Sequence, residues 1–171
     1  MPDSAPWPGW AMMTDMKKLT RQLTYEASAE AVSAMLDDPA FREEVLERQR
    51  VVRGSVTVEG DHVRIEQVHS TDGLPSFATK LAGNEIVIVQ EEVWTSPTSA
   101  DVRLSIPGKP GEANGTLTLT ESGGTTTEVM DLDVVVRIPL VGGKVEELVR
   151  DMVGVALDVE ERVGREWLAR G

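Results

Sequence analysis

The chain has 171 residues, 40% of them hydrophobic, which is enough for one domain with a sizeable core. Its formal net charge of −12 disfavours nonspecific binding to nucleic acid or anionic membranes, because both depend on clusters of lysine and arginine. The absence of cysteine excludes disulfides, thiol catalysis and thiolate metal sites, and two histidines leave little room for a histidine-based metal site. We therefore expect no cofactor, no metal and no nucleic-acid partner.

The first 16 residues contain three prolines and two tryptophans but show no periodicity. They lack the basic segment and the uninterrupted apolar segment of a signal peptide. No later run approaches the roughly 18 apolar residues that a membrane span needs. We predict a disordered leader over residues 1–16, one domain over residues 17–170, and a cytoplasmic protein without stable membrane insertion. The oligomeric state stays open.

The first elements of the domain are predicted to be a strand and two short helices. Alternating residues over 19–25 indicate the strand. Ser28 is a suitable N-cap for a helix that ends near Leu36, and the proline at position 39 separates it from a second helix over 40–49. Two helices this short make a poor core alone, so we expect them to close an edge or an end of a sheet.

The next segments, 51–59 and 62–70, read as a hairpin around Gly60-Asp61. Glycine at the first central position is typical of a type II′ turn. That turn fixes a register, and the paired residues on its inward face follow. They are Val58 opposite Val63, Val56 opposite Ile65, Gly54 opposite Gln67, and Val52 opposite His69.

The second half of the domain predicts four more strands. One or two helical turns within 71–84 precede a hairpin of residues 85–95 and 101–106, and a last hairpin joins 114–120 to 125–138. Pairing across the loop at 96–100 places Trp94 opposite Val102, Glu92 opposite Leu104, and Gln90 opposite Ile106. In this register Ile86, Ile88, Gln90, Glu92 and Trp94 face inward.

The C-terminal segment from Val145 to Arg170 predicts one long helix with an apolar stripe. The stripe consists of Val145, Leu148, Val149, Met152, Val155, Ala156, Val159, Val163 and Trp167. Charged residues on the other side, including Glu146, are expected to face water, and Gly154 and Gly164 are expected to lie toward that polar side. The fold class is therefore α+β: a seven-stranded antiparallel sheet curled around a long C-terminal helix, with two short helices after the first strand.

This element order resembles the helix-grip pattern of the START-like, or SRPBCC, superfamily. More narrowly, the chain resembles the DUF2505 family in three short segments, Glu92-Val-Trp94, residues 106–111 (IPGKPG) and residues 138–146 (IPLVGGKVE). The resemblance covers about residues 17–168. It implies a cavity between helix and sheet, which the superfamily uses for lipids, polyketides, hormones or other apolar molecules. It implies no particular reaction.

The candidate site is a set of polar residues on otherwise apolar inward faces: Gln67, His69, Gln90 and Glu92, beside Trp94. Buried polar groups need hydrogen-bond partners, and a ligand pocket would supply them. Alternatively, these residues lie at strand ends, or they pair with each other and with Arg21. The full set of expected ligand-binding residues is Gln67, His69, Ile88, Gln90, Glu92, Trp94, Leu104, Leu117, Met130, Val134, Val149, Met152 and Ala156.

The first hypothesis for function is binding or transport of a small hydrophobic or amphipathic molecule in that cavity. A second is an enzyme of the cyclase or hydrolase type, with His69 and Glu92 as a general acid/base pair. A third is an interaction domain whose interior is filled by its own side chains. A void between the helix and the sheet would separate the first hypothesis from the third.

Overall fold

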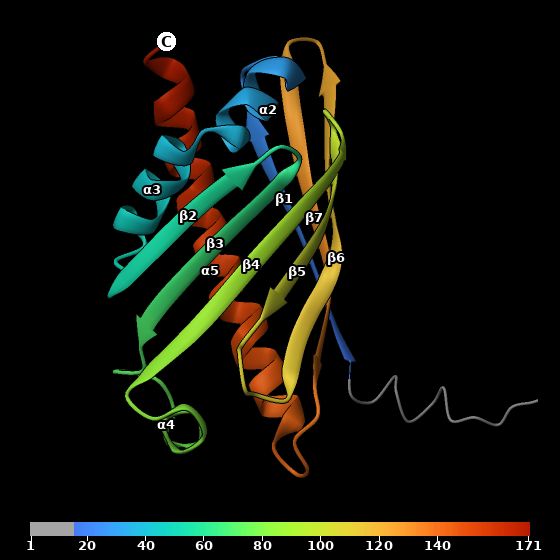
Figure 1. Cartoon of the computed structure of the whole chain (residues 1–171). Helices are drawn as coiled ribbons and strands as arrows, with labels where there is room; N and C mark the ends of the chain where they lie inside the picture. Colours follow the sequence, from blue (N-terminus) through green and yellow to red (C-terminus); the bar gives the residue numbers. More distant parts are fainter. Residues whose placement is uncertain (1–15) are drawn as a thin grey trace, which may run out of the picture.

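The computed structural model describes residues 16–171. The leader predicted over residues 1–16 lies outside this range except for Met16, which begins the first strand. The described elements, with the labels of Figure 1, are β1 (Met16–Tyr25), α2 (Ala29–Asp37), α3 (Pro39–Arg48), β2 (Arg53–Glu59), β3 (His62–Ser70), α4 (Ser76–Ala82), β4 (Glu85–Ser96), β5 (Ser99–Ser105), β6 (Gly111–Ser122), β7 (Thr125–Val136) and α5 (Gly142–Ala169).

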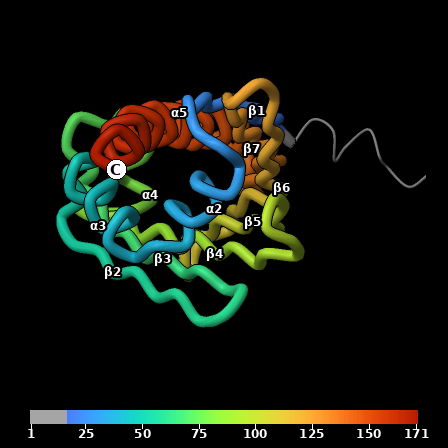
Figure 2. The backbone as a smooth tube through the Cα atoms, turned by 90° about the horizontal axis from the view of Figure 1, so that it is seen from above, coloured from blue at the N-terminus to red at the C-terminus, as the bar shows by residue number. Residues whose placement is uncertain are grey.

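The strands form one antiparallel sheet in the order β1-β7-β6-β5-β4-β3-β2. Neighbours in the chain are neighbours in the sheet, except that β1 pairs with β7. Viewed from above, the sheet curves from β1, beside α5, round to β2, beside α3 (Figure 2). The helix α5 lies on the inner side of this curve. The predicted fold class, a seven-stranded antiparallel sheet around a long C-terminal helix, is confirmed.

The two short helices begin where the sequence predicts. The Ser28 hydroxyl accepts a hydrogen bond from the Ala31 amide at 3.1 Å, and the Asp38 carboxylate accepts one from Ala40 at 2.9 Å. Both bonds satisfy amides that have no partner within the first turn of a helix. Pro39 occupies the first turn of α3, where its missing N–H costs nothing. Together α2 and α3 pack against α5 at one end of the molecule.

The β2–β3 hairpin has the predicted register, with Val58 opposite Val63 and Gly54 opposite Gln67. Gly60 has φ of +60° and Asp61 is not among the residues with positive φ, as a type II′ turn requires. The predicted inward position of Val52 is wrong. The strand β2 begins at Arg53, two residues after the predicted start, and Val52 is half exposed.

The predicted register between β4 and β5 is wrong by two residues. Trp94 lies opposite Ala100, Glu92 opposite Val102, and Gln90 opposite Leu104. The strands extend further into the connection than predicted, to Ser96 and from Ser99, with an irregularity between Trp94 and Ser96. Because side chains alternate with a period of two, this shift leaves every inward residue on the inward face.

The buried face of α5 is rotated from the predicted stripe. Val155 is 63% exposed, whereas Leu157, Glu160 and Gly164, which the prediction left off the stripe, are buried. Glu146, expected in water, is fully buried, and its carboxylate accepts a hydrogen bond from the Val136 amide at 3.0 Å. The helix is buried against β1, β7 and α3 together, so more of its circumference is covered than one sheet face would cover.

Gly154 and Gly164 of α5 lie on this buried face and not on the polar side. A Cβ atom at Gly164 would lie 2.6 Å from Cε1 of Tyr25, and one at Gly154 would overlap the guanidinium of Arg21. Both neighbours belong to β1. The two glycines therefore let α5 approach the first strand closely, and their burial corrects the sequence-based expectation.

Candidate functional site

A cavity of about 120 Å³ lies between the sheet and α5. We call it the inner chamber. Its walls are mainly aliphatic side chains from β3 to β7, from α3 and from the middle of α5. Met152, Val153, Ala156 and Leu157 line it on the helix side. The space between the helix and the sheet is thus not filled by the chain's own side chains.

A second cavity of about 440 Å³, the outer chamber, adjoins the first. Both chambers are lined by Ile86, Ile106, Val136, Val149 and Met152. The outer chamber continues toward α4, the loop between β5 and β6, and the loop between β7 and α5. Figure 1 shows these three segments at the end of the molecule opposite α2 and α3. The two chambers therefore run along α5 toward that end.

Most of the residues predicted from the sequence are brought together in the inner chamber. They are Gln67, His69, Ile88, Gln90, Leu104, Met130, Val134, Val149, Met152 and Ala156. Three others do not line it. Leu117 is buried in the main hydrophobic core, Trp94 is partly buried and packs against that core, and Glu92 is fully buried.

Glu92 is held by three side chains. One carboxylate oxygen accepts hydrogen bonds from Arg42 at 2.7 Å and from the Trp94 indole at 3.1 Å, and the other accepts one from Gln90 at 2.7 Å. Arg42 is 2% exposed and also donates to the Leu36 carbonyl at 2.7 Å. The polar residues do pair with one another, but their cation is Arg42 and not Arg21. Arg21 pairs with Asp158 instead.

His69 has a different partner from Glu92. Its ring nitrogen Nε2 lies 2.8 Å from the side-chain oxygen of Gln67. Burial lowers the pKa of His69, which favours the neutral ring. This pair gives the chamber wall a neutral hydrogen-bonding group among apolar neighbours.

The sequence-based acid/base pair of His69 and Glu92 is not formed. Glu92 lies opposite Val63, six residues along β3 from His69, which is about 20 Å at about 3.3 Å per residue. No hydrogen bond joins the two side chains among the described residues. General acid/base catalysis by this pair requires both side chains to contact the same reacting molecule. The separation of His69 and Glu92 therefore does not support this mechanism.

The helix α3 and its C-cap residue, Gln49, supply site residues that the sequence analysis missed. Arg42, Val45, Leu46 and Gln49 all line the inner chamber. They recur at the i, i+3, i+4 and i+7 spacing of one helical face. The amide of Gln49 donates to the Ala156 carbonyl at 3.0 Å, which connects α3 to the chamber side of α5. The helical spacing is the signal that could have identified this face.

Two buried acids, Glu160 of α5 and Glu128 of β7, complete the polar region near α3. Glu160 lines the inner chamber, and its carboxylate lies 3.9 Å from the Arg42 guanidinium. Burial raises the pKa of Glu160 to about 7, and burial together with Glu160 raises the pKa of Glu128 well above its usual range. The Tyr25 hydroxyl donates to Glu128 at 3.5 Å. Because two buried carboxylates repel each other, the pair favours holding a proton near neutral pH.

Within residues 16–171, no group of three or more histidine or acidic side chains is arranged to hold a metal ion. In the same range, no helix combines the length and the apolar composition required to cross a bilayer.

Comparison with known proteins places this geometry in context. A model of a family of unknown function, DUF2505, matches residues 20–168. An uncharacterized protein of Mycobacterium tuberculosis is 29% identical over 120 residues, 64% of this chain and 68% of that protein. The Zhui aromatase/cyclase of Streptomyces sp. R1128 superposes with a TM-score of 0.65 at 15% identity, over 91% of this chain and 94% of that one. A START superfamily protein of Mycobacterium smegmatis has a TM-score of 0.57 at 14% identity, over 90% and 97%. These structural likenesses show the helix-grip fold.

Proposed function

Because the chain belongs to the DUF2505 family and has the helix-grip fold, we propose that it binds a small hydrophobic or amphipathic molecule between the sheet and α5. Members of the START-like superfamily bind hydrophobic ligands or act as polyketide cyclases. The proposal for this chain is the non-catalytic one, binding or transport.

The observation that carries the proposal is the pair of adjoining chambers with apolar walls. Burying an apolar ligand there gains about 25 cal/mol for each Å² removed from water. The outer chamber, about 440 Å³, lies within the range of small-molecule pockets, which is roughly 300–1,000 Å³. A few polar groups, including the Gln67–His69 pair and Gln90, would orient the ligand.

A second candidate is acid–base chemistry on the bound molecule, and one observation favours it. Glu160 lines the inner chamber with its pKa raised to about 7, where a carboxyl group can both give and accept a proton near neutral pH. This differs from the acid/base pair suggested by the sequence because neither His69 nor Glu92 takes part. If the wild-type protein converts the copurified molecule to a product of different mass and the Glu160→Gln variant does not, acid–base chemistry is favoured over simple binding.

Native mass spectrometry of the protein purified from its own cells tests the binding proposal. We expect the native protein to have a mass above that of the chain alone. The additional mass should disappear when the complex is dissociated. Ala156→Phe should lower the occupied fraction, because residue 156 lines the inner chamber and the larger ring takes up ligand space. Val155→Phe is the matched control, since the neighbouring side chain is 63% exposed.

Circular dichroism and thermal unfolding would show that both variants fold. A wild-type protein that carries no small molecule would contradict the proposal. So would equal loss of the bound mass in Ala156→Phe and Val155→Phe, because only the first substitution enters the chamber.

A further inference from the structure

The acidic character of the chain is not uniform, and one end is cationic. Three segments border the outer chamber at that end, residues 71–84, 106–111 and 137–144, which we call the mouth. They contain four of the 17 basic residues, Lys80, Lys109, Arg137 and Lys144, and one of the 29 acidic residues, Asp72. The mouth therefore has a net charge of +3, and the rest of the chain has −15.

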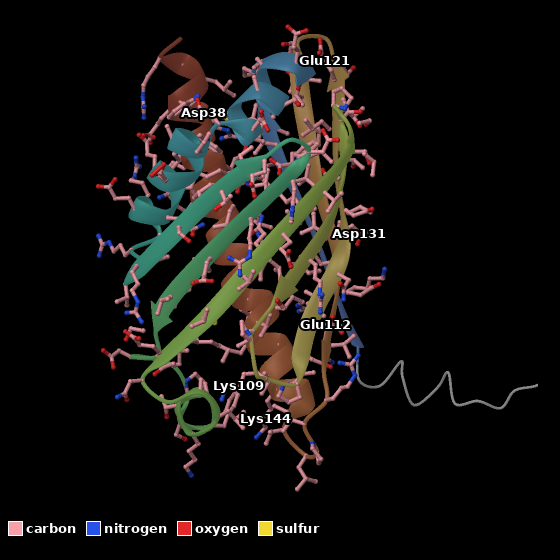
Figure 3. The ribbon with its side chains drawn as sticks, in the orientation of Figure 1. Asp38, Lys109, Glu112, Glu121, Asp131 and Lys144 are labelled. Carbon is pink, nitrogen blue, oxygen red and sulfur yellow. The ribbon has the colours of Figure 1, made fainter. Side chains whose placement is uncertain are left out.

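In the part of the chain that the structure describes, the lysines of the mouth have no carboxylate within ion-pair distance. Within residues 16–171, Lys80, Lys109 and Lys144 form no ion pair, whereas Arg137 pairs with Glu112. All three lysines are exposed, and among the described residues the Lys109 ammonium donates only to the Leu81 carbonyl, at 3.0 Å. In Figure 3 Lys109 and Lys144 lie together at the end that also holds α4. Their charges are therefore available to a partner.

Apolar side chains are exposed among these lysines. Leu140 is 103% exposed at the tip of the loop between β7 and α5, and Leu81 of α4 is 37% exposed. Leu140 has φ of +72°, a left-handed conformation that a bulky residue rarely adopts. Such a conformation in a fully exposed leucine is unfavourable for the isolated chain and is often associated with a functional site. Here it directs an aliphatic side chain away from the protein.

We propose that the mouth docks on the surface of an anionic lipid bilayer, with Leu140 entering the headgroup region and the lysines contacting acidic headgroups. Clusters of basic residues bind such surfaces by electrostatic attraction, and exposed aliphatic residues add to the affinity. The outer chamber would then open toward the bilayer, where apolar molecules are concentrated. Docking on a bilayer goes beyond the proposed ligand binding. An experiment can contradict the docking without contradicting the ligand binding.

The combination of features favours a bilayer over an acidic protein. A protein partner would accept Leu140 only in a matching pocket, but a bilayer accepts a single protruding leucine without one. The rest of the chain has a net charge of −15 and would be repelled by an anionic surface, which favours approach by the mouth. The charge distribution therefore sets one orientation, with α2 and α3 away from the lipid (Figure 1).

Vesicle flotation with the full chain tests the inference. We expect binding to equimolar phosphatidylglycerol and phosphatidylcholine vesicles, little binding to phosphatidylcholine alone, and release by added salt. Lys80→Gln/Lys144→Gln should lower the partition coefficient about 25-fold, because each cation lost should lower it about fivefold. Neither lysine makes a side-chain hydrogen bond or ion pair within residues 16–171, so the fold should be unaffected. Leu140→Ser should also weaken binding.

The matched control is Arg64→Gln/Arg162→Gln, which removes two exposed cations outside the mouth. This variant should float with the vesicles as wild type does. Equal losses in the two double variants would overturn the inference, as would equal binding to neutral and anionic vesicles. Absence of vesicle binding would also overturn it and would leave an acidic protein as the candidate partner. Binding of an apolar probe without vesicles, measured in parallel, reports on the proposed function alone.

Discussion

At the scale of single residues, the least expected feature is a pair of carboxyl groups, Glu128 and Glu160, inside an apolar structure. Their nearest cation, Arg42, already binds Glu92 at 2.7 Å and lies further from Glu160, at 3.9 Å. One positive charge therefore faces three buried acids. This imbalance, together with burial, raises the pKa values of Glu128 and Glu160.

The raised pKa of Glu160 predicts a specific dependence of stability on pH. Its folded-state pKa is about 7, above the ordinary value of 4.5, so the folded protein keeps a proton that the unfolded chain releases. This contribution to stability is complete below pH 4.5 and is lost as the pH rises to about 7. Glu160→Gln stays neutral, so its free energy of unfolding should rise relative to wild type over that range, by up to about 3 kcal/mol. Urea unfolding at several pH values measures this difference.

Glu166→Gln is the control for that measurement, because its effect has the opposite sign. The exposed Arg48 guanidinium holds the pKa of Glu166 below its usual range, so Glu166 contributes stability at neutral pH that is lost in acid. That variant should lose stability relative to wild type as the pH rises. A Glu160→Gln difference that is independent of pH would contradict the assigned environment.

At the scale of elements, α3 is the helix that joins the sheet to α5. Arg42 binds Glu92 of β4 and lies close to Glu160 of α5, and Gln49 binds the α5 backbone. Phe41 of the same helix meets Trp167 of α5 edge to face, with ring centroids 5.6 Å apart. Arg42, Gln49 and Glu160 all line the inner chamber, so these contacts form part of its wall.

Arg42→Met should therefore destabilise the protein strongly. The methionine side chain suits an apolar site, but Glu92 would remain fully buried without its cation. Removing one partner of a buried ion pair typically costs about 3–5 kcal/mol. Chemical unfolding of the variant measures the loss. Arg48 also belongs to α3, but it is exposed and pairs with Glu166 of α5. Arg48→Met should therefore have a much smaller effect on stability. Equal losses of stability in the two variants would contradict the assigned contribution of the buried Arg42–Glu92 pair.

Elements with a local signal were predictable from the sequence. The strands have a period of two, and Ser28, Asp38-Pro39 and Gly60 mark helix starts and a turn. The β4–β5 register failed because the connection is shorter than its composition suggested. The phase of α5 failed because it packs on β1, β7 and α3 together, so Glu146, Gly154 and Gly164 are buried while Val155 is exposed.

At the scale of the whole molecule, the chamber-lining residues could be predicted only for the sheet and for the middle of α5. Inward residues such as Gln67, His69 and Gln90 follow from strand alternation. The i, i+3, i+4 and i+7 spacing of α3 marks one face of that helix, but the spacing does not determine how a short helix packs across the end of the sheet. Net charge likewise concealed the cationic mouth, since a total of −12 gives no information about where the charges lie.

The central claim is that a ligand occupies the space between the sheet and α5. Its most direct test is a fluorescence titration with N-phenyl-1-naphthylamine, an apolar probe, on protein stripped of bound molecules. We expect saturable binding at one probe per chain, weakened at least tenfold in Ala156→Phe and unchanged in Val155→Phe. Saturable binding that both variants retain equally, or no binding by the folded wild-type protein, would contradict the claim.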